Sequence, residues 1–355
     1  MHSLKSIKNY RNKNERLVLN EWFNQLHVFV LDPSNTGYFS EPALSISNSI
    51  STGEISADDC QSDNEGNLKQ INLTAIYTSI IRDYARLRGD MHAASKARDV
   101  LEKMHDVNNY HLQSKAEGLQ SLANVCIQVN TYNLVIGAYA NSKGNENVEA
   151  ALKLLQRMVD SWAKGDNKSA IPHPDETSFS HCINALSNTN DETTAIKESH
   201  RLIKIFESIY NGSNSTFSPT AQVYNSCLDL YCEKLANKQE LMSTCSKMVK
   251  RMKHLSFEFP DVEPDVKTSS LLLKACSLVD GHALAKIEAL ETAVQIFNEL
   301  VGKESKGAIQ KLTTNDRCYL YMMRCILNLV SDAEEIQSKN LDLFLEGKIK
   351  TIFFC

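Results

Sequence analysis

The sequence lacks three features that would narrow its function: an excess of positive charge, a long apolar run and a secretory signal. Its net charge is −5 over 355 residues, whereas a domain that binds nucleic acid without selectivity is expected to be basic. No apolar run reaches the roughly 18 residues that a membrane span requires, so we expect no membrane segment. The 42% of hydrophobic residues suffices for a packed core.

Motifs that indicate an enzyme or a metal site are also missing. The ten cysteines form no CxxC pair and the ten histidines no HExxH. There is no GxxxxGK(S/T), no GxSxG and no carboxylate pair at a recognisable metal-binding spacing. We therefore expect no enzymatic activity, no catalytic residue, no metal, no cofactor and no small-molecule substrate. Four cysteines lie in apolar helical patterns, which indicates reduced, buried side chains: Cys182, Cys227, Cys276 and Cys325.

Composition divides the chain into four segments. Residues 1–32 combine a basic stretch with an amphipathic helix; the stretch lacks the apolar centre of a secretory signal, and an organelle transit peptide stays open as an alternative. Residues 33–70 are rich in Ser, Asp and Gly without a helical period, which is typical of a disordered linker. Residues 71–330 are helical and repetitive, and we expect a C-terminal helical tail over 331–355.

A pair of residues, aromatic or equivalent and then small and polar, recurs near the start of successive helices. The spacing is 45 to 55 residues, which is typical of a helical repeat array. We expect the aromatic members to pack between helices, with base stacking as the alternative. The pairs are Tyr77-Thr78, Tyr132-Asn133, Phe179-Ser180, Tyr224-Asn225, Ser269-Ser270 and, more weakly, Tyr319-Leu320.

A second amphipathic helix follows in each of the first five repeats. It carries a small or apolar residue followed by apolar residues four and seven positions later, which places all three on one helical face. One helix pair cannot bury such a face alone, so neighbouring pairs must stack. These triplets are Ala97/Leu101/Met104, Ala151/Leu155/Met158, Leu202/Phe206/Ile209, Cys245/Val249/Met252 and Ala293/Phe297/Leu300.

The stretch TYNLVIGAYA…AALKLLQRM…PD, which begins at Thr131, resembles the pentatricopeptide repeat (PPR), a helical hairpin of about 35 residues. Repeats that open at Val129, Ala221 and Val266 match well, those at Thr74 and Glu176 less well, and one near Asp316 in part. The resemblance implies an all-α fold, a right-handed α-solenoid of stacked antiparallel helix pairs. The longer spacings of this chain imply long inter-helix and inter-repeat loops.

The resemblance also implies sequence-selective binding of single-stranded RNA, in the RNA metabolism of a mitochondrion or plastid. In this class one base is read per helical repeat. By similarity, one reader follows the aromatic residue and the other directly precedes the next repeat. The implied pairs are Asn133 with Asp175, Ser180 with Thr220, Asn225 with Asp265, Ser270 with Asn315 and, across a long intervening segment, Thr78 with Gln128. Asn with Asp resembles the uracil-type combination of the family, and Ser with Asn the adenine-type combination.

A structural role for the same residues stays open. Asp, Thr and Asn are preferred helix N-caps, so capping alone explains Asp175, Thr220, Asp265 and Asn315. The first-helix readers are expected in the first helical turn, where side chains commonly bond to the local backbone.

A scaffold that binds protein partners is the alternative function. The family tends to place a basic residue, which can meet phosphate, eight residues after the first reader. Here those positions hold Arg86, Asn141, Asn188, Glu233 and Leu278. A binding face lined with Asp and Glu would favour the scaffold.

Overall fold

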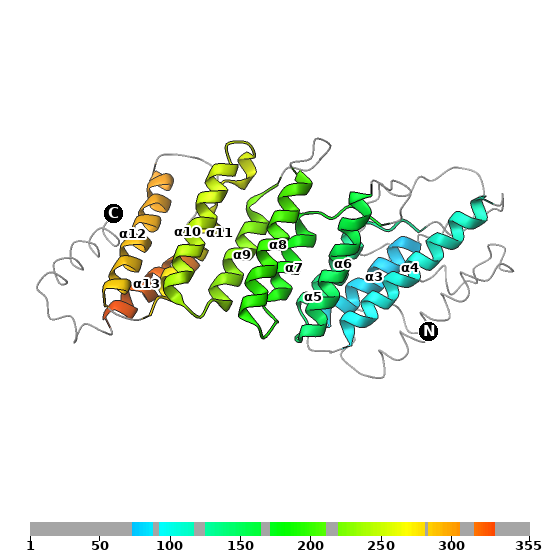
Figure 1. Cartoon of the computed structure of the whole chain (residues 1–355), viewed down its shortest axis with the longest axis horizontal. Helices are drawn as coiled ribbons and strands as arrows, with labels where there is room; N and C mark the ends of the chain where they lie inside the picture. Colours follow the sequence, from blue (N-terminus) through cyan, green and yellow to red (C-terminus); the bar gives the residue numbers. More distant parts are fainter. Residues whose placement is uncertain are drawn as a thin grey trace, which may run out of the picture. The chain divides into compact units, whose positions relative to one another are not determined.

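The computed structural model describes residues 73–87, 92–116, 125–164, 171–210, 219–280, 283–305 and 316–330. Within these ranges the secondary structure consists of eleven α-helices and one short 3₁₀ helix, with no strand (Figure 1). The predicted all-α fold is therefore confirmed for the described part of the chain. The segments 1–32, 33–70 and 331–355, predicted as a helix, a disordered linker and a tail, lie outside it.

The helices alternate between a shorter first helix and a longer second helix. The first helices are α3 (Leu73–Arg86), α5 (Val129–Ala140), α7 (Glu176–Leu186), α9 (Ala221–Lys234), α11 (Val266–Ser277) and α13 (Asp316–Val330). The second helices are α4 (Ala93–Ala116), α6 (Asn145–Ala163), α8 (Glu192–Tyr210), α10 (Lys238–Leu255) and α12 (Ala283–Ser305). The 3₁₀ helix η3 (Pro260–Val262) lies between α10 and α11.

The chain forms two compact units. One contains residues 1–143 and 150–174, and the other contains residues 144–149 and 175–355. In the first unit, α3 packs on α4, and both pack on α5. In the second unit, α9 shows the repeated arrangement: it contacts the preceding pair, α7 and α8, its own second helix α10 and the next first helix α11 (Figure 1). In the second unit, α9 thus buries its apolar residues against helices on both sides.

The predicted core positions are buried, with one exception. Tyr77, Tyr132, Phe179 and Tyr224 are at most 1% exposed, which confirms that they pack between helices. All five second-helix triplets are buried as well. The prediction is wrong for Tyr319, which is 49% exposed, because no described helix covers its outer side.

The four cysteines predicted in the core are buried free thiols, as expected: Cys182, Cys227, Cys276 and Cys325. Burial raises the pKa of the Cys325 thiol to about 12. The thiolate is the reactive form of cysteine, so a raised pKa keeps this side chain an unreactive packing group near neutral pH.

A buried histidine joins α4 to α5 in the first unit. Nε2 of His105 lies 2.8 Å from the hydroxyl of Tyr132, and the two rings meet edge to face. Burial, with a smaller contribution from the positive charge of Arg157, lowers the pKa of His105 to about 4. The imidazole is therefore neutral in the folded protein near neutral pH.

We expect acid to destabilise the first unit through His105. The folded pKa lies below the unfolded value of about 6.5, so the unfolded chain binds the extra proton, and stability falls as the pH drops through 6.5 towards 4. In urea unfolding, the free energy of unfolding of the parent protein should fall between pH 7 and pH 4.5. The fall should be about 2 kcal/mol smaller for His105→Gln. His173→Gln, at an exposed position of the same unit, is the control. If the free energy of unfolding of His105→Gln changed with pH as much as that of the parent protein, this role of His105 would be contradicted.

Candidate functional site

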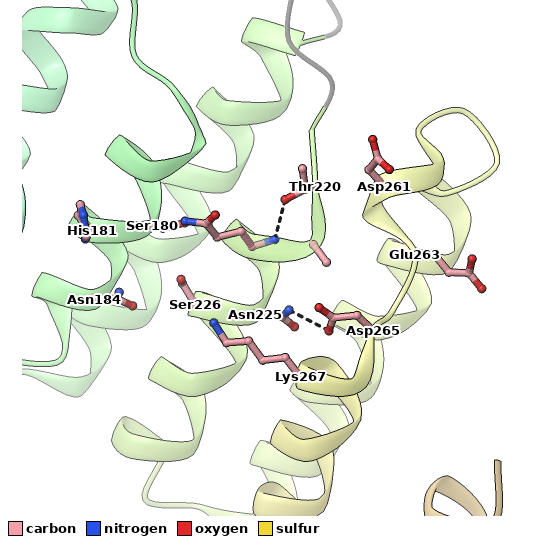
Figure 2. A pocket seen from close by; sticks show the side chains of 12 residues that line it. Ser180, His181, Asn184, Thr220, Asn225, Ser226, Asp261, Glu263, Asp265 and Lys267 are labelled. Carbon is pink, nitrogen blue, oxygen red and sulfur yellow. Dashed lines mark hydrogen bonds between the residues drawn. The ribbon is translucent and has the colours of Figure 1, made fainter. Parts of the chain in front are cut away.

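An open groove in the second unit gathers four of the predicted site residues. It has a volume of about 410 Å³ and lies between the N-terminal halves of α7, α9 and α11 (Figure 2). Ser180 comes from α7, Thr220 and Asn225 from the start of α9, and Asp265 from the start of α11. Both predicted reader pairs that lie wholly within the described part of this unit therefore meet at one place.

Asp265 is the N-cap of α11. Its backbone is extended, and its Oδ1 accepts a hydrogen bond from the backbone N–H of Thr268 at 2.7 Å. The hydroxyl of Thr268 accepts in return from the backbone N–H of Asp265 at 3.1 Å. This reciprocal capping box satisfies two backbone donors at the helix start. The capping role that stayed open for Asp265 is thus confirmed.

Asn225 reaches into this cap from the preceding first helix. Its Nδ2 donates to Oδ1 of Asp265 at 3.2 Å, as Figure 2 shows. Its Oδ1 accepts from the hydroxyl of Thr268 at 2.7 Å. The side-chain amide therefore joins α9 to the first turn of α11. Two residues predicted to read one base, 40 positions apart in the sequence, are in direct contact.

The first-helix readers lie deeper in the structure than predicted. Asn133, Ser180, Asn225 and Ser270 are each the fifth residue of their helix, just past the first turn. All four are buried, with at most 5% of their surface exposed. The printed bonds of the Asn225 side chain go to the next repeat, not to its local backbone. The expectation of first-turn positions with local bonds is therefore wrong for Asn225.

Thr220 caps α9 and also binds back to α7. Its Oγ1 accepts from the backbone N–H of Gln222 at 3.2 Å. Glu176, the first residue of α7, accepts from the N–H of Thr220 at 2.8 Å and from its hydroxyl at 2.6 Å. Burial raises the pKa of Glu176, although these two hydrogen bonds act in the opposite direction. A carboxylate thus joins α7 to α9 much as the Asn225 amide joins α9 to α11.

Ser180, the predicted partner of Thr220, presents an unpaired hydroxyl. Its Oγ is buried and has no hydrogen-bond partner among the described residues. Leaving a buried hydroxyl unpaired costs about 1–3 kcal/mol. The side chain lines the groove beside His181 (Figure 2), whose pKa is lowered by burial against the opposing effect of Asp175.

Three carboxylates and one ammonium group border the groove: Asp261, Glu263, Asp265 and Lys267. All four residues are exposed. The printed hydrogen bonds of the Asp265 carboxylate all use Oδ1, which leaves Oδ2 as an acceptor at the groove. The border carries net negative charge, so it favours N–H donors and cationic groups and disfavours phosphate.

The remaining predicted residues of the first unit do not form a comparable site. Thr78 is half-buried, and its hydroxyl lies 3.5 Å from that of Thr131. Gln128, its implied partner, precedes α5 as an N-cap whose side chain makes no capping bond. Asn133 is buried in α5, whereas its implied partner Asp175 belongs to the second unit.

In the second unit, Asp175 caps α7 through a second capping box. Its carboxylate accepts from the backbone N–H of Ser178 at 2.9 Å, and the hydroxyl of Ser178 accepts from the N–H of Asp175 at 3.2 Å. Ser270 is buried in α11, while its implied partner Asn315 lies outside the described residues. Capping is thus confirmed for Asp175, Thr220 and Asp265, and stays a prediction for Asn315.

Sequence reasoning missed Glu176, Thr268 and the acidic border of Asp261 and Glu263. A partial signal existed for Thr268: Asp265 is a preferred N-cap residue, and a hydroxyl three residues later can return a hydrogen bond to the cap. No sequence signal indicated that Glu176 binds Thr220, 44 residues away, because that contact depends on how α7 packs on α9.

We expect Asn225→Ala and Asp265→Ala to be non-additive in their effects on stability. Asp265→Ala removes an N-cap worth about 1–2 kcal/mol and also the acceptor of the Asn225 amide. Because each substitution breaks the same hydrogen bond, a double-mutant cycle by chemical unfolding should give a coupling energy of about 0.5–1 kcal/mol. Asn225→Ala combined with Asp175→Ala, which removes the cap of α7, is the control and should be additive. A coupling energy of zero for the first pair would show that the hydrogen bond between Asn225 and Asp265 does not stabilise the fold.

Neither side-chain clusters nor known proteins identify a further site. Among the described residues, no group of three or more His, Cys, Asp or Glu side chains is arranged to hold a metal ion. No helix within the described ranges is both long and apolar enough to cross a membrane.

Comparison with protein-family models, with curated proteins and with solved structures finds no match. The resemblance to the pentatricopeptide repeat is therefore carried by the residues of this chain alone.

Proposed function

We propose that this chain binds single-stranded RNA as a right-handed α-solenoid, in the RNA metabolism of a mitochondrion or plastid. One observation carries the proposal: the Asn225 amide and the Asp265 carboxylate, 40 residues apart in sequence, meet at 3.2 Å beside an open groove. Two residues can read one base only when both side chains can reach the same base, and this pair meets that condition. The repeated packing of first and second helices in the second unit supports the solenoid, and its handedness follows from the family resemblance.

The polar groups at the groove suit the edge of a base. Oδ2 of Asp265 is an acceptor for a ring N–H, such as the one that uracil presents between its two carbonyl groups. Asn225 is 1% exposed and already holds Oδ1 of Asp265. In this proposal Asp265 makes the exposed contact, and Asn225 fixes the direction of its carboxylate. Ser180 and Thr220, the other implied reader pair, line the same groove and mark the neighbouring base position in this proposal.

A scaffold that binds protein partners is the second candidate, and the charge of the groove favours it. Asp261, Glu263 and Asp265 outnumber Lys267 at the border. Such a border repels the phosphates of RNA and attracts the Lys and Arg side chains of a peptide. Under the RNA proposal these carboxylates weaken binding, so we expect low, salt-sensitive affinity.

Neutralising the acidic border separates the two functions. If the groove binds RNA, Asp261→Asn combined with Glu263→Gln should strengthen binding of a short U-rich RNA about two- to fivefold at low salt, because two repulsive charges are removed. Fluorescence anisotropy with a labelled RNA measures this change. Asp280→Asn with Glu288→Gln, at two exposed positions that do not line the groove, gives the same change in net charge and is the control.

Two results would count against RNA binding at the groove. In the first, neither the parent protein nor the border variant binds RNA at low salt, but the parent binds an Arg-rich peptide and the border variant binds that peptide more weakly. This result would favour the scaffold. The other is an equal gain in RNA affinity for the border variant and its control, which would indicate a net-charge effect unrelated to the groove.

A further inference from the structure

The second helix α10 is the most basic of the described helices, in a chain whose net charge is −5. It contains four lysines and one arginine against a single glutamate. The arginine, Arg251, forms an ion pair with Glu207 of α8. Lys247, Lys250 and Lys253 are exposed, and none of them forms an ion pair with another described residue. The outer face of α10 therefore presents three ammonium groups to solvent.

Phe257 extends this face past the end of α10. Its side chain is 89% exposed, more than any other large hydrophobic side chain in the described part of the chain. The backbone N–H of Phe257 donates to the carbonyl of His254 at 3.4 Å, so the chain continues to turn beyond the helix. Phe257 follows Lys253 by four residues and Lys250 by seven, a spacing that places all three on one side. An exposed aromatic ring thus lies in line with the lysines.

The lysines at positions 250 and 253 are not a feature of the repeat. Alignment of the second-helix triplets gives their equivalents in α6 and α8, none of which is basic. These are Gln156 and Glu207 for Lys250, and Val159 and Tyr210 for Lys253. The packing of a second helix in this fold therefore requires no cation at either position, and the charge belongs to α10 in particular.

We propose that the outer face of α10 binds single-stranded RNA, with its lysines on the phosphates and Phe257 stacked on an unpaired base. A positive surface combined with an exposed aromatic ring is how proteins hold a single strand. Lysine binds phosphate as a point charge, and the exposed hydroxyls of Ser243 and Ser246 on the same helix add donors. A paired base has no free face for the ring, so Phe257 makes the surface selective for single strands.

The composition of the face favours a nucleic acid over a membrane. A helix that lies in a membrane interface buries an apolar face in the lipid, whereas the apolar residues of α10 pack inside the protein. Five of them are at most 9% exposed: Leu241, Cys245, Met248, Val249 and Met252. Phe257 alone adds little apolar area, which is too little to hold a helix in lipid but enough to stack on one base.

This face is distinct from the groove, because none of its residues lines the groove. The groove border has three carboxylates and one ammonium group, which disfavours phosphate. The lysines of α10 supply the opposite charge. The inference rests on the proposed function only for the class of ligand, and it holds even if the groove reads no base.

Neutralising two lysines tests the phosphate contacts. In fluorescence anisotropy with a short labelled oligo-U RNA, Lys250→Gln combined with Lys253→Gln in the full chain should weaken binding at least fivefold at low salt. The slope of log affinity against log salt should also become shallower by about one, because two phosphate contacts are lost. Lys164→Gln combined with Lys197→Gln, at two exposed positions off this face, changes the net charge equally. This control should bind within twofold of the parent protein.

Removing the ring tests the stacking. Phe257→Ala should weaken binding of the oligo-U RNA at least fivefold and leave binding of a duplex RNA of the same length unchanged. Phe257→Trp, which keeps an aromatic ring, should retain the affinity of the parent protein. Because Phe257 is 89% exposed, neither substitution should change the melting temperature.

Three outcomes would overturn the inference. Equal losses for the lysine variant and its control would indicate a net-charge effect. Equal losses of single-stranded and duplex RNA in Phe257→Ala would exclude stacking. Unchanged RNA binding by the lysine variant, with lost sedimentation on vesicles of phosphatidylcholine and phosphatidylserine, would assign the face to a membrane. The groove fails separately: Asp265→Asn tests the preference among bases, whereas the α10 variants change the affinity for all bases alike.

Discussion

The second unit depends on side-chain hydrogen bonds between the starts of successive first helices. The buried amide of Asn225 holds the capping carboxylate of Asp265, and the carboxylate of Glu176 holds the capping residue Thr220. A helix start has backbone N–H groups without intrahelical partners, so its cap must be fixed in place. Because the caps of α9 and α11 are each held by the preceding first helix, the starts of α7, α9 and α11 keep a common register. The groove is the space that this register leaves between them.

These hydrogen bonds also limit how the groove can recognise a ligand. A buried amide that serves the structure cannot at the same time offer all its polar atoms to a base. Asn225 is therefore better placed to orient Asp265 than to bind a ligand directly, and in the proposed function Oδ2 of Asp265 is the selective acceptor. The nearby carboxylates of Asp261 and Glu263 add negative charge where a phosphate would pass. In the proposed function, base selectivity and affinity for the RNA backbone are therefore opposed at this site.

The sequence predicted the helices better than it predicted the site. Triplets such as Ala293/Phe297/Leu300 identify second helices because one buried face imposes a helical period. The caps Asp175 and Asp265 were predictable because capping is a local interaction. The contact of Glu176 with Thr220 and the burial of Asn225 were not, since both arise from the packing of one repeat on the next. Tyr319 shows the same limit: its residue type matches Tyr224, but it is 49% exposed, which residue type alone does not indicate.

In the proposed function, Asp265 is held by Asn225 and reads one base. Asp265→Asn tests it most directly, because Asn is an equally good N-cap and leaves the fold intact while it replaces an acceptor by a donor at the groove. The measurement compares the affinities of four short RNAs that differ only at the base opposite this repeat. We expect the parent protein to prefer U at this position, and Asp265→Asn to shift the preference towards C, whose ring nitrogen accepts a hydrogen bond. An unchanged order of the four affinities would contradict it.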